Sequence, residues 1–202
     1  MHGWAWFASA LAFAVSMSAT PGPNNTMVAV SGANWGFRRT VPHMLGIAVG
    51  FALMLLLVAL GAGEAMRGRP WVHAVLRWVG AAYLLWLAWR IATARPNPEA
   101  GAGGQPLSLR QAALFQWVNP KAWVIALGAV VTYTTRAGGA LFGEAALLAA
   151  MFLVVTLPAL SLWTLVGVGT AKLLRTPRAL RWFNLAMACL LIASLVPMLA
   201  AG

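Results

Sequence analysis

The feature that most constrains this chain is a series of apolar stretches, each about 20 residues or longer, separated by short polar connections. A helix of about 20 apolar residues is long enough to cross the ~30 Å hydrocarbon core of a bilayer. Hydrophobic residues make up 61% of the 202 residues and charged residues 8%, whereas a soluble domain is about 45–50% apolar and ~25% charged. This difference excludes a soluble globular enzyme.

Six of the stretches are predicted to span the membrane, so the predicted fold class is an all-α membrane protein. They cover residues 4–35, 41–63, 71–94, 111–135, 141–168 and 179–199. The Gly- and Pro-rich segment 95–106 is predicted to be a hinge between two halves, about 1–97 and 98–202, of a single transmembrane domain. From Trp4 to Arg38 a continuous helix would be ~51 Å long, too long for one perpendicular crossing. The N-terminal run therefore either crosses fully, giving six spans, or folds back, giving five.

The basic residues predict how the spans are oriented. Nine lie in the first, third and fifth connections: Arg38, Arg39, Arg90, Arg95, Arg110, Lys172, Arg175, Arg178 and Arg181. The opposite side has three: Arg67, Arg69 and Arg136. Because short cytoplasmic loops are enriched in Lys and Arg, loops 1, 3 and 5 are predicted to be cytoplasmic and both termini external. The basic residues are distributed over the connections and do not form one basic face with aromatic residues between them. This distribution argues against nucleic acid as a partner.

Two helix-breaking segments lie inside predicted spans, Thr-Pro-Gly-Pro-Asn-Asn at 20–25 and Asn-Pro-Lys at 119–121. Interrupted helices at membrane depth are tolerated only where protein or water satisfies the freed backbone groups, and corresponding interrupted helices form the sites of many transporters. An offset of 97 residues relates Pro23 to Pro120, Arg39 to Arg136, Gly46 to Gly143 and Gly61 to Pro158. The offset predicts an inverted repeat of three plus three spans with broken helices 1 and 4, and chance pairing is the alternative.

The residues at the breaks predict two half-helices that begin inside the membrane. Asn119 suits the N-cap position, and Pro23 and Pro120 suit the first position of a helix. Lengths along a straight helix place Lys121 ~16 Å from Arg110 and ~22 Å from Arg136, near the middle of the membrane. Because a helix begins with a partial positive charge, an amino group at that point indicates that an anion binds there.

The resulting hypothesis is a substrate site in which Lys121 and nearby backbone amides hold a carboxylate. Asn24, Asn25 and Asn119 would position the substrate amino group or line its path, and Pro21, Gly22, Pro23 and Pro120 would keep the backbone open. Tyr83 and Gln116 either line the path or form hydrogen bonds between helices. The alternative is that the breaks only kink two packed helices and that Lys121 extends toward the interface.

Two titratable residues are candidates for proton coupling. Glu144 lies near the start of the fifth stretch, and it is either a carboxylate that exchanges a proton or a residue at the level of the lipid headgroups. His43 is either a titrating group or a surface residue. No spacing of His, Cys and carboxylates resembles a metal site, and the single Cys189 argues against a thiol–disulfide carrier. No cofactor and no catalytic constellation are expected. The pairs Gly32/Gly36 and Gly46/Gly50 predict close helix packing within the chain, with a homodimer as the alternative.

Over nearly its whole length the sequence resembles the LysE/RhtB family of amino-acid exporters. The likeness rests on Thr-Pro-Gly-Pro-Asn-Asn at 20–25, Gly-Ile-Ala-Val-Gly at 46–50, Gly-Ala-Ala-Tyr-Leu at 80–84, Phe-Gln-Trp-Val-Asn-Pro-Lys at 115–121 and Asn-Leu-Ala-Met at 184–187. The resemblance implies a secondary exporter of amino acids or their derivatives in the bacterial inner membrane, driven by proton or ion exchange, and not an enzyme.

The second span departs from the pattern of family members that export basic amino acids. Those members carry acidic residues within the membrane, yet this chain has Phe51 after Gly50 and no Asp at all. A neutral amino acid is therefore favoured over lysine or arginine. Another small solute, a cation, or a protein without transport activity are the alternatives.

Overall fold

The computed structural model describes residues 3–62, 69–93, 105–135, 140–173 and 176–196. Every element within these residues is helical, as the sequence predicts. Most of the predicted hinge at 95–106 lies outside the described residues, and so do four of the basic residues that predict the orientation: Arg67, Arg95, Arg136 and Arg175.

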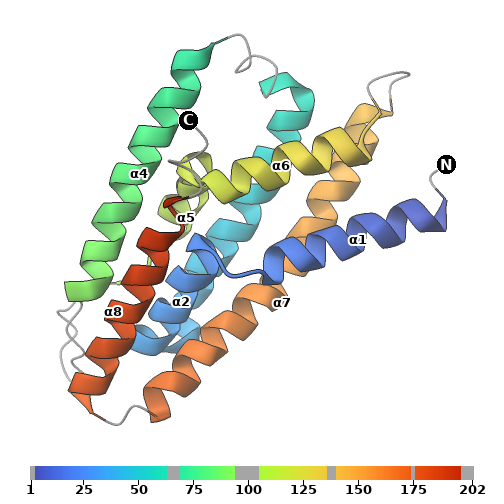
Figure 1. Ribbon diagram of the computed structural model, residues 1–202. Helices are drawn as coiled ribbons and strands as arrows, with labels where there is room; N and C mark the ends of the chain where they lie inside the picture. Colours follow the sequence, from blue (N-terminus) through green and yellow to red (C-terminus); the bar gives the residue numbers. More distant parts are fainter. Residues whose placement is uncertain (1–2, 63–68, 94–104, 136–139, 174–175, 197–202) are drawn as a thin grey trace.

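The described elements follow one another as shown in Figure 1: α1 (Trp4–Ala19), α2 (Pro23–Leu57), η1 (Val58–Ala62), α4 (Pro70–Thr93), α5 (Leu109–Phe115), η2 (Gln116–Val118), α6 (Pro120–Tyr133), α7 (Leu141–Leu173) and α8 (Pro177–Ala193). Four of the helices, α2, α4, α6 and α8, begin at a Pro, whose missing N–H has no helical partner at that position. Helix α5 begins with a capping box, in which Ser108 Oγ accepts from the Gln111 N–H and Gln111 Oε1 accepts from the Ser108 N–H.

Helix α2 is a hairpin of two helical legs, residues 23–35 and residues 37–57, joined at Gly36. Gly36 has φ 78° and ψ 170°, a backbone region that is essentially restricted to glycine. Ser31 Oγ lies 3.2 Å from His43 Nδ1, although the two residues would be ~18 Å apart along a straight helix. The chain therefore reverses between them. The expectation that Gly36 packs closely against another helix is wrong, because a Cβ there would meet open space and the residue makes the turn instead.

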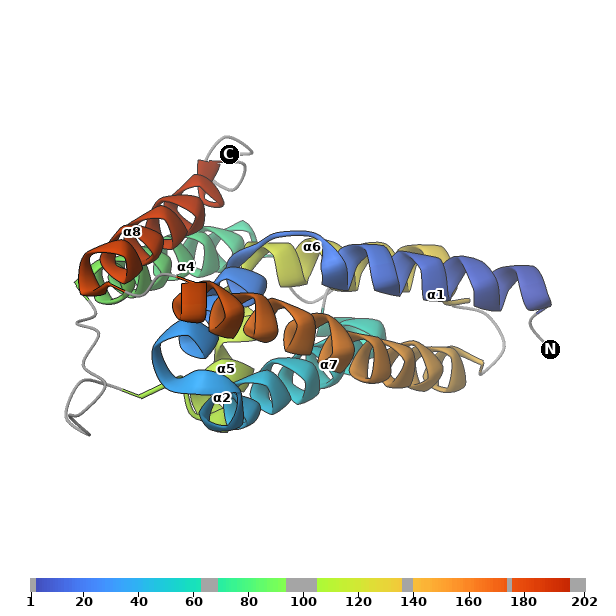
Figure 2. The same ribbon diagram turned by 90° about the horizontal axis from the view of Figure 1, so that it is seen from below.

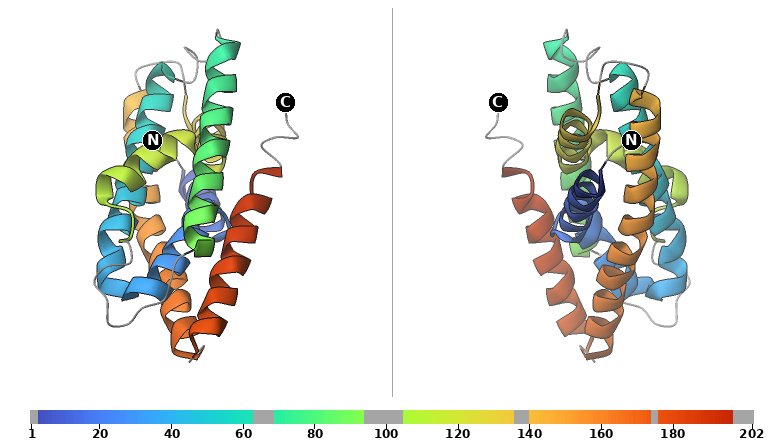
Figure 3. Two further views of the ribbon diagram at one scale, coloured as in Figure 1. Left: turned by 90° about the vertical axis from the view of Figure 1, so that its left-hand side faces the viewer. Right: turned by 90° about the vertical axis from the view of Figure 1, so that its right-hand side faces the viewer.

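The two legs of α2 and helix α7 lie at the centre of the molecule. Helices α1 and α6 extend together to one side, and α4 and α8 lie on the other (Figures 1 and 2). The right-hand view of Figure 3 looks nearly along α1, with α7 crossing beside it. One apolar core joins α1, α6, the second leg of α2 and the first half of α7. The other joins both legs of α2, with Met44 and Ile47 from the second, to α4, α5, α8 and Leu160 of α7.

Close contacts between helices depend on small residues. A Cβ at Gly32 would overlap the Thr164 carbonyl oxygen of α7, and a Cβ at Gly46 would overlap the Leu109 carbonyl oxygen of α5. Gly50 faces the backbone of α5 in the same way. Close packing within the chain is therefore confirmed for these three glycines.

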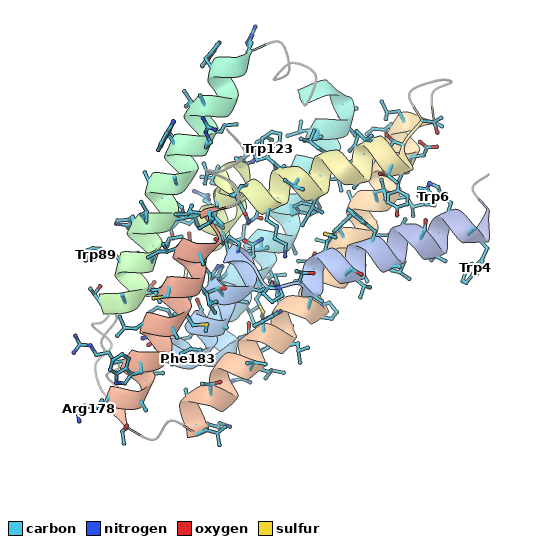
Figure 4. All side chains as sticks on the ribbon, in the orientation of Figure 1. Trp4, Trp6, Trp89, Trp123, Arg178 and Phe183 are labelled. Atoms are coloured by element: carbon cyan, nitrogen blue, oxygen red, sulfur yellow. The ribbon has the colours of Figure 1, made fainter. Side chains whose placement is uncertain are left out.

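Within the described residues, three helices are long and apolar enough to cross a membrane: Pro23–Gly61, Ala74–Thr93 and Leu141–Leu173. Leu109–Val118 and Pro120–Tyr133 would together form a fourth span, broken and bent by 72°. Helices α1 and α8, with 16 and 17 residues, are shorter. Trp4 on α1 and Trp89 on α4 point away from the molecule on opposite sides in Figure 4 and are 80% and 63% exposed. The described part of the chain is all-helical with three or four candidate membrane spans, and the predicted helix break at residues 119–121 is confirmed.

Arg77, which belongs to neither group of basic residues that predicts the orientation, lies inside α4, where its guanidinium group is 5.9 Å from the Trp78 ring centroid. Pro158 does not break its helix, because α7 continues through it to Leu173. Gly61, its partner in the 97-residue offset, does interrupt helical geometry, with φ 112°.

Candidate functional site

The two breaks predicted from the sequence face each other in the structure. Helix α1 ends at Ala19, and after three residues α2 begins at Pro23. On the other side, Asn119 caps α6, and its Oδ1 accepts from the Lys121 N–H at 3.2 Å. The predicted N-cap at Asn119 and the predicted helix starts at Pro23 and Pro120 are confirmed.

Side chains from other elements satisfy the carbonyl groups at the end of α1. Asn25 Nδ2 donates to the carbonyl oxygens of Ser18 and Thr20, each at 2.9 Å. Trp163 Nε1 of α7 donates to the Ala19 carbonyl oxygen at 3.2 Å. The last carbonyl groups of a helix have no partner within the helix, and these bonds supply partners for them at the end of α1.

Lys121 completes this arrangement from α6. Its Nζ donates to the Thr20 carbonyl oxygen at 2.5 Å and to the Pro21 carbonyl oxygen at 3.3 Å. The start of α6 carries a partial positive charge and offers the Lys121 amino group no negative partner. The end of α1 carries a partial negative charge, and the amino group binds there. The sequence interpretation assigned that charge to a bound anion, and in the structure carbonyl groups supply it. The straight-helix estimate of the depth of Lys121 does not hold, because the chain bends by 72° at this break.

A reciprocal pair of amide hydrogen bonds joins the two breaks. Asn24 Nδ2 donates to Gln116 Oε1 at 2.9 Å, and Gln116 Nε2 donates to Asn24 Oδ1 at 3.2 Å and to the Ala112 carbonyl oxygen at 2.9 Å. Gln116 is completely buried. It therefore bonds across helices, which was one of its two predicted roles.

A small cavity lies between the breaks, with a volume of about 50 Å³. Five of the predicted site residues line it: Gly22, Asn24, Asn25, Asn119 and Lys121. Its other walls come from α1, the second leg of α2, α6 and α7: Met17, Ser18, Ile47, Phe51, Ala122, Ile125, Phe152, Thr156 and Leu160. A water molecule occupies ~30 Å³ of liquid, so the cavity in this conformation is too small for an amino acid.

The sequence interpretation did not find several residues of this cavity. Ser18 Oγ and Thr156 Oγ lie 3.2 Å apart and connect α1 to α7, and Phe51 packs edge-on against Phe152. Ser18 stands close to the first break in the sequence, and that proximity was the available signal. No pattern in the sequence connects Thr156 or Phe152 to the breaks.

Pro21, Pro23, Pro120, Gln116 and Tyr83 are not among the residues that line the cavity. The three prolines form the backbone of the breaks. Tyr83 packs against Phe115 and Trp86, with ring centroids 5.5 Å and 5.4 Å away. The structure thus places Tyr83 between aromatic side chains of its own helix, α4, and of the last residue of α5.

The two candidates for proton coupling lie apart from this cavity. Glu144 is buried, and its carboxylate accepts from the Thr135 N–H and, at 2.7 Å, from Thr135 Oγ. It therefore holds the chain just beyond the end of α6. His43 is also buried, between the two legs of α2, so the interpretation as a surface residue is wrong.

Within the described residues, no group of three or more His, Cys, Asp or Glu side chains is placed to hold a metal ion. The site is instead built from amide, hydroxyl, carbonyl and amino groups. Such groups can bind a small zwitterion through hydrogen bonds and charge.

The sequence is similar to a family of translocators. A family model, LysE type translocator, matches residues 15–197. The cysteine/O-acetylserine efflux proteins of Escherichia coli (strain K12), Shigella sonnei (strain Ss046) and Shigella flexneri are each 37% identical to the chain over 115 residues. The matched segment covers 56% of this chain and 58% of each relative, so the chain spans little more than half the length of these relatives. No solved structure matches the chain significantly.

Proposed function

The chain belongs to the LysE type translocator family, and from this premise we propose that it is a secondary transporter that exports amino acids or their derivatives across the bacterial inner membrane. The proposal gives the two helix breaks the role of the substrate site. It assigns no reaction to the protein, in keeping with a family of translocators.

The observation that carries the proposal is the contact between Lys121 Nζ and the carbonyl oxygens of Thr20 and Pro21. Carbonyl oxygens accept hydrogen bonds from an ammonium group, and a lysine amino group binds a carboxylate. An amino acid carries both groups on one carbon atom. Its ammonium group would replace Nζ on the two carbonyl oxygens, and its carboxylate would bind the released Lys121.

Substrate binding then requires the breaks to separate, because the cavity between them holds about 50 Å³. Asn24, Asn25 and Asn119 line this cavity and would position the substrate. Pro21, Gly22, Pro23 and Pro120 would keep the backbone from closing into continuous helices. Gln116 would hold the two breaks together through Asn24, and Tyr83 would act from a greater distance along the path.

A neutral side chain is the proposed specificity. The residues that line the cavity include no carboxylate to pair with a cationic side chain, and Glu144, the one carboxylate within the described ranges, binds Thr135. Cysteine and O-acetylserine, which the names of the relatives mention, both carry side chains that are mainly uncharged at neutral pH. They are therefore the first candidates for the substrate.

We also propose that the chain crosses the membrane six times as two inverted halves, about 1–97 and 98–202. Such a repeat would make α1 equivalent to α5, the first leg of α2 equivalent to α6, and the second leg equivalent to α7. Each element of the first apolar core would then have its equivalent in the second core, which supports the repeat. The orientation proposed from the basic residues keeps loops 1, 3 and 5 in the cytoplasm and the C-terminus outside, and a homodimer is the proposed alternative to a monomer.

For proton coupling, the geometry supports His43 over Glu144. His43 lines a second cavity together with Arg90, a charged group that faces the same space, whereas the Glu144 carboxylate is engaged with Thr135. An imposed proton gradient should drive export by the native chain but not by a His43→Gln variant. Equal gradient-driven export by the two chains would contradict this role.

A substrate panel tests the proposed function. Proteoliposomes are loaded singly with O-acetylserine, cysteine, leucine, threonine or arginine, and efflux is compared with that from protein-free vesicles. The neutral solutes should leave faster than arginine. Faster efflux of arginine would contradict the neutral specificity, and efflux of none of the five from vesicles with inserted protein would contradict amino-acid export. Efflux of a metal cation in that case would support the alternative solute.

A further inference from the structure

A second cavity, of about 410 Å³, lies along the first leg of α2. Its walls are the first leg, His43 at the start of the second leg, the end of α4 and residues 105–107. Small-molecule sites usually measure ~300–1,000 Å³, whereas the cavity at the breaks measures about 50 Å³. In this conformation the second cavity is therefore the one with room for a small solute.

His43 is one of the residues that line this cavity, and its ring carries one unpartnered polar atom. The side chain is 1% exposed, and its Nδ1 lies 3.2 Å from Ser31 Oγ. Its Nε2 is buried and has no hydrogen-bond partner among the described residues. A buried polar atom usually has a partner, so a small rotation of the ring toward the cavity would give Nε2 a partner on a bound molecule.

Arg90 supplies a positive charge to the same cavity. Its guanidinium group lies 5.0 Å from the Trp86 ring centroid, and it forms no ion pair with a carboxylate in the part of the chain that the structure describes. Guanidinium groups bind carboxylates through paired hydrogen bonds. The remaining wall is largely apolar, with Met27, Val30 and Leu107. The matching ligand is a small amphipathic molecule with a carboxylate and a second polar group.

One face of the first leg of α2 connects this cavity to the breaks. Asn24, Met27 and Ser31 follow one another at helical spacings of three and four residues, so they share a face. Asn24 lines the cavity at the breaks, and Met27 and Ser31 line the second cavity. Seven residues of helix correspond to ~10 Å. A solute in the second cavity is thus about two helical turns from the proposed substrate site.

We infer that the second cavity is an entry site, where an amino acid binds before it reaches the helix breaks. This inference rests on the proposed function. Arg90 holds the carboxylate, the His43–Ser31 pair bonds the second polar group, and the apolar wall covers the carbon chain. The cavity lies beside the Gly36 turn, which carries Arg38 and Arg39 and is proposed to face the cytoplasm. An exporter takes up its substrate from that side.

Site-directed labelling tests the entry site. Cys189 is the single cysteine, so a Cys189→Ala chain contains none. In this background Val30→Cys places a thiol in the wall of the second cavity, and Val28→Cys places one on the same leg outside both cavities. Both valines are buried, 2% and 0% exposed, which makes Val28 a matched control. The purified variants are treated with methyl methanethiosulfonate, a small uncharged thiol reagent, with and without O-acetylserine, leucine or threonine.

The Val30→Cys variant should react, and at least one of the three amino acids should slow the reaction about tenfold at a concentration near ten times its Kd. The Val28→Cys variant should react slowly whether or not amino acid is present. Adding Arg90→Gln should remove the protection at the same concentration. An unreactive Val30→Cys variant, or labelling that none of the amino acids slows, would overturn the entry site.

Efflux from proteoliposomes, measured with the same variants before labelling, separates this inference from the proposed function. Efflux without protection at Val30 contradicts the entry site and leaves amino-acid export standing. Protection without efflux supports a binding site in the second cavity and contradicts export. Arg90→Gln should raise the apparent KM for efflux more than it lowers kcat, because a higher solute concentration compensates for weaker binding at an entry site.

Discussion

Asn24 and Gln116, 92 residues apart, exchange two hydrogen bonds across the helix breaks. Both are amide side chains, so each donates one bond and accepts the other. Gln116 is completely buried, and water does not replace a partner that it loses. The pair therefore fixes how the start of η2 lies against the start of α2.

Replacing Gln116 by leucine should destabilise the protein. The change leaves the Asn24 amide without its partner, which costs about 1–3 kcal/mol in the free energy of unfolding. Unfolding of the purified protein in detergent micelles measures the loss. The double variant Asn24→Leu, Gln116→Leu removes both polar groups and should recover part of it. A double variant whose loss equals the sum of the two single losses would show that the pair does not act as a unit.

Replacing Lys121 by methionine should abolish export and leave the protein inserted in the membrane. Methionine keeps the length of the side chain but cannot donate to the Thr20 and Pro21 carbonyl oxygens or bind a carboxylate. Efflux from loaded proteoliposomes measures the effect. Lys172→Met, at an exposed position in the last turn of α7, is the matched control and should export normally. Unimpaired efflux from the Lys121→Met variant would exclude Lys121 as the anchor for the substrate.

Gly22→Ala should reduce export by acting on Lys121 alone. The added Cβ would lie 2.8 Å from Lys121 Cδ and 3.2 Å from Nζ, so the lysine side chain must shift. Gly22 has φ 177°, an extended conformation that alanine also adopts, so the backbone is unaffected. A weakening of one hydrogen bond, ~1.4 kcal/mol, corresponds to about a tenfold change in efflux at low substrate concentration.

Gly169→Ala serves as the control for this variant, because a Cβ at Gly169 meets open space. It should leave efflux at the native level. Native efflux from the Gly22→Ala chain as well would mean that the position of the Lys121 amino group does not limit transport.

Gly36→Ala should destabilise the hairpin of α2 by about 1–3 kcal/mol, because alanine is strained at φ 78° and ψ 170°. A Cβ at Gly36 has no neighbour within 4 Å, so the backbone alone causes the loss. Gly143→Ala in α7 also meets open space and has ordinary helical geometry. Thermal unfolding of both variants measures the difference. Equal melting temperatures would contradict the requirement for glycine at the turn.

The helix breaks could be predicted from the sequence because their signals are local. Asn119 and Pro120 carry the signals for an N-cap and a first helical position within two residues, and α6 begins there. Pro23 carries the same information for α2. Apolar length predicted the helical membrane fold for the same reason, since it is a property of each segment by itself.

The partners of the site residues could not be predicted, because they come from distant parts of the chain. The carbonyl oxygen that Lys121 contacts at Thr20 is 101 residues away, and no local pattern pairs the two. His43 stands beside Pro42 at the start of a predicted span, and the sequence left a titrating group and a surface residue both open. The Gly36 turn buries it by bringing Ser31 against it. A glycine in a helical pattern predicts close packing and a sharp turn equally well, so the sequence alone did not distinguish the two.

The first leg of α2, residues 23–35, is anchored at both ends, by Asn25 on the α1 carbonyl groups and by Ser31 on His43. A helix of this length behaves as a rigid rod, since its backbone bonds keep Asn24 and Ser31 in a fixed relation. Any tilt of the rod that widens the space at Asn24 also moves Ser31 in the larger cavity. The leg therefore couples the two cavities mechanically, so that a tilt of this helix changes the size of both at once.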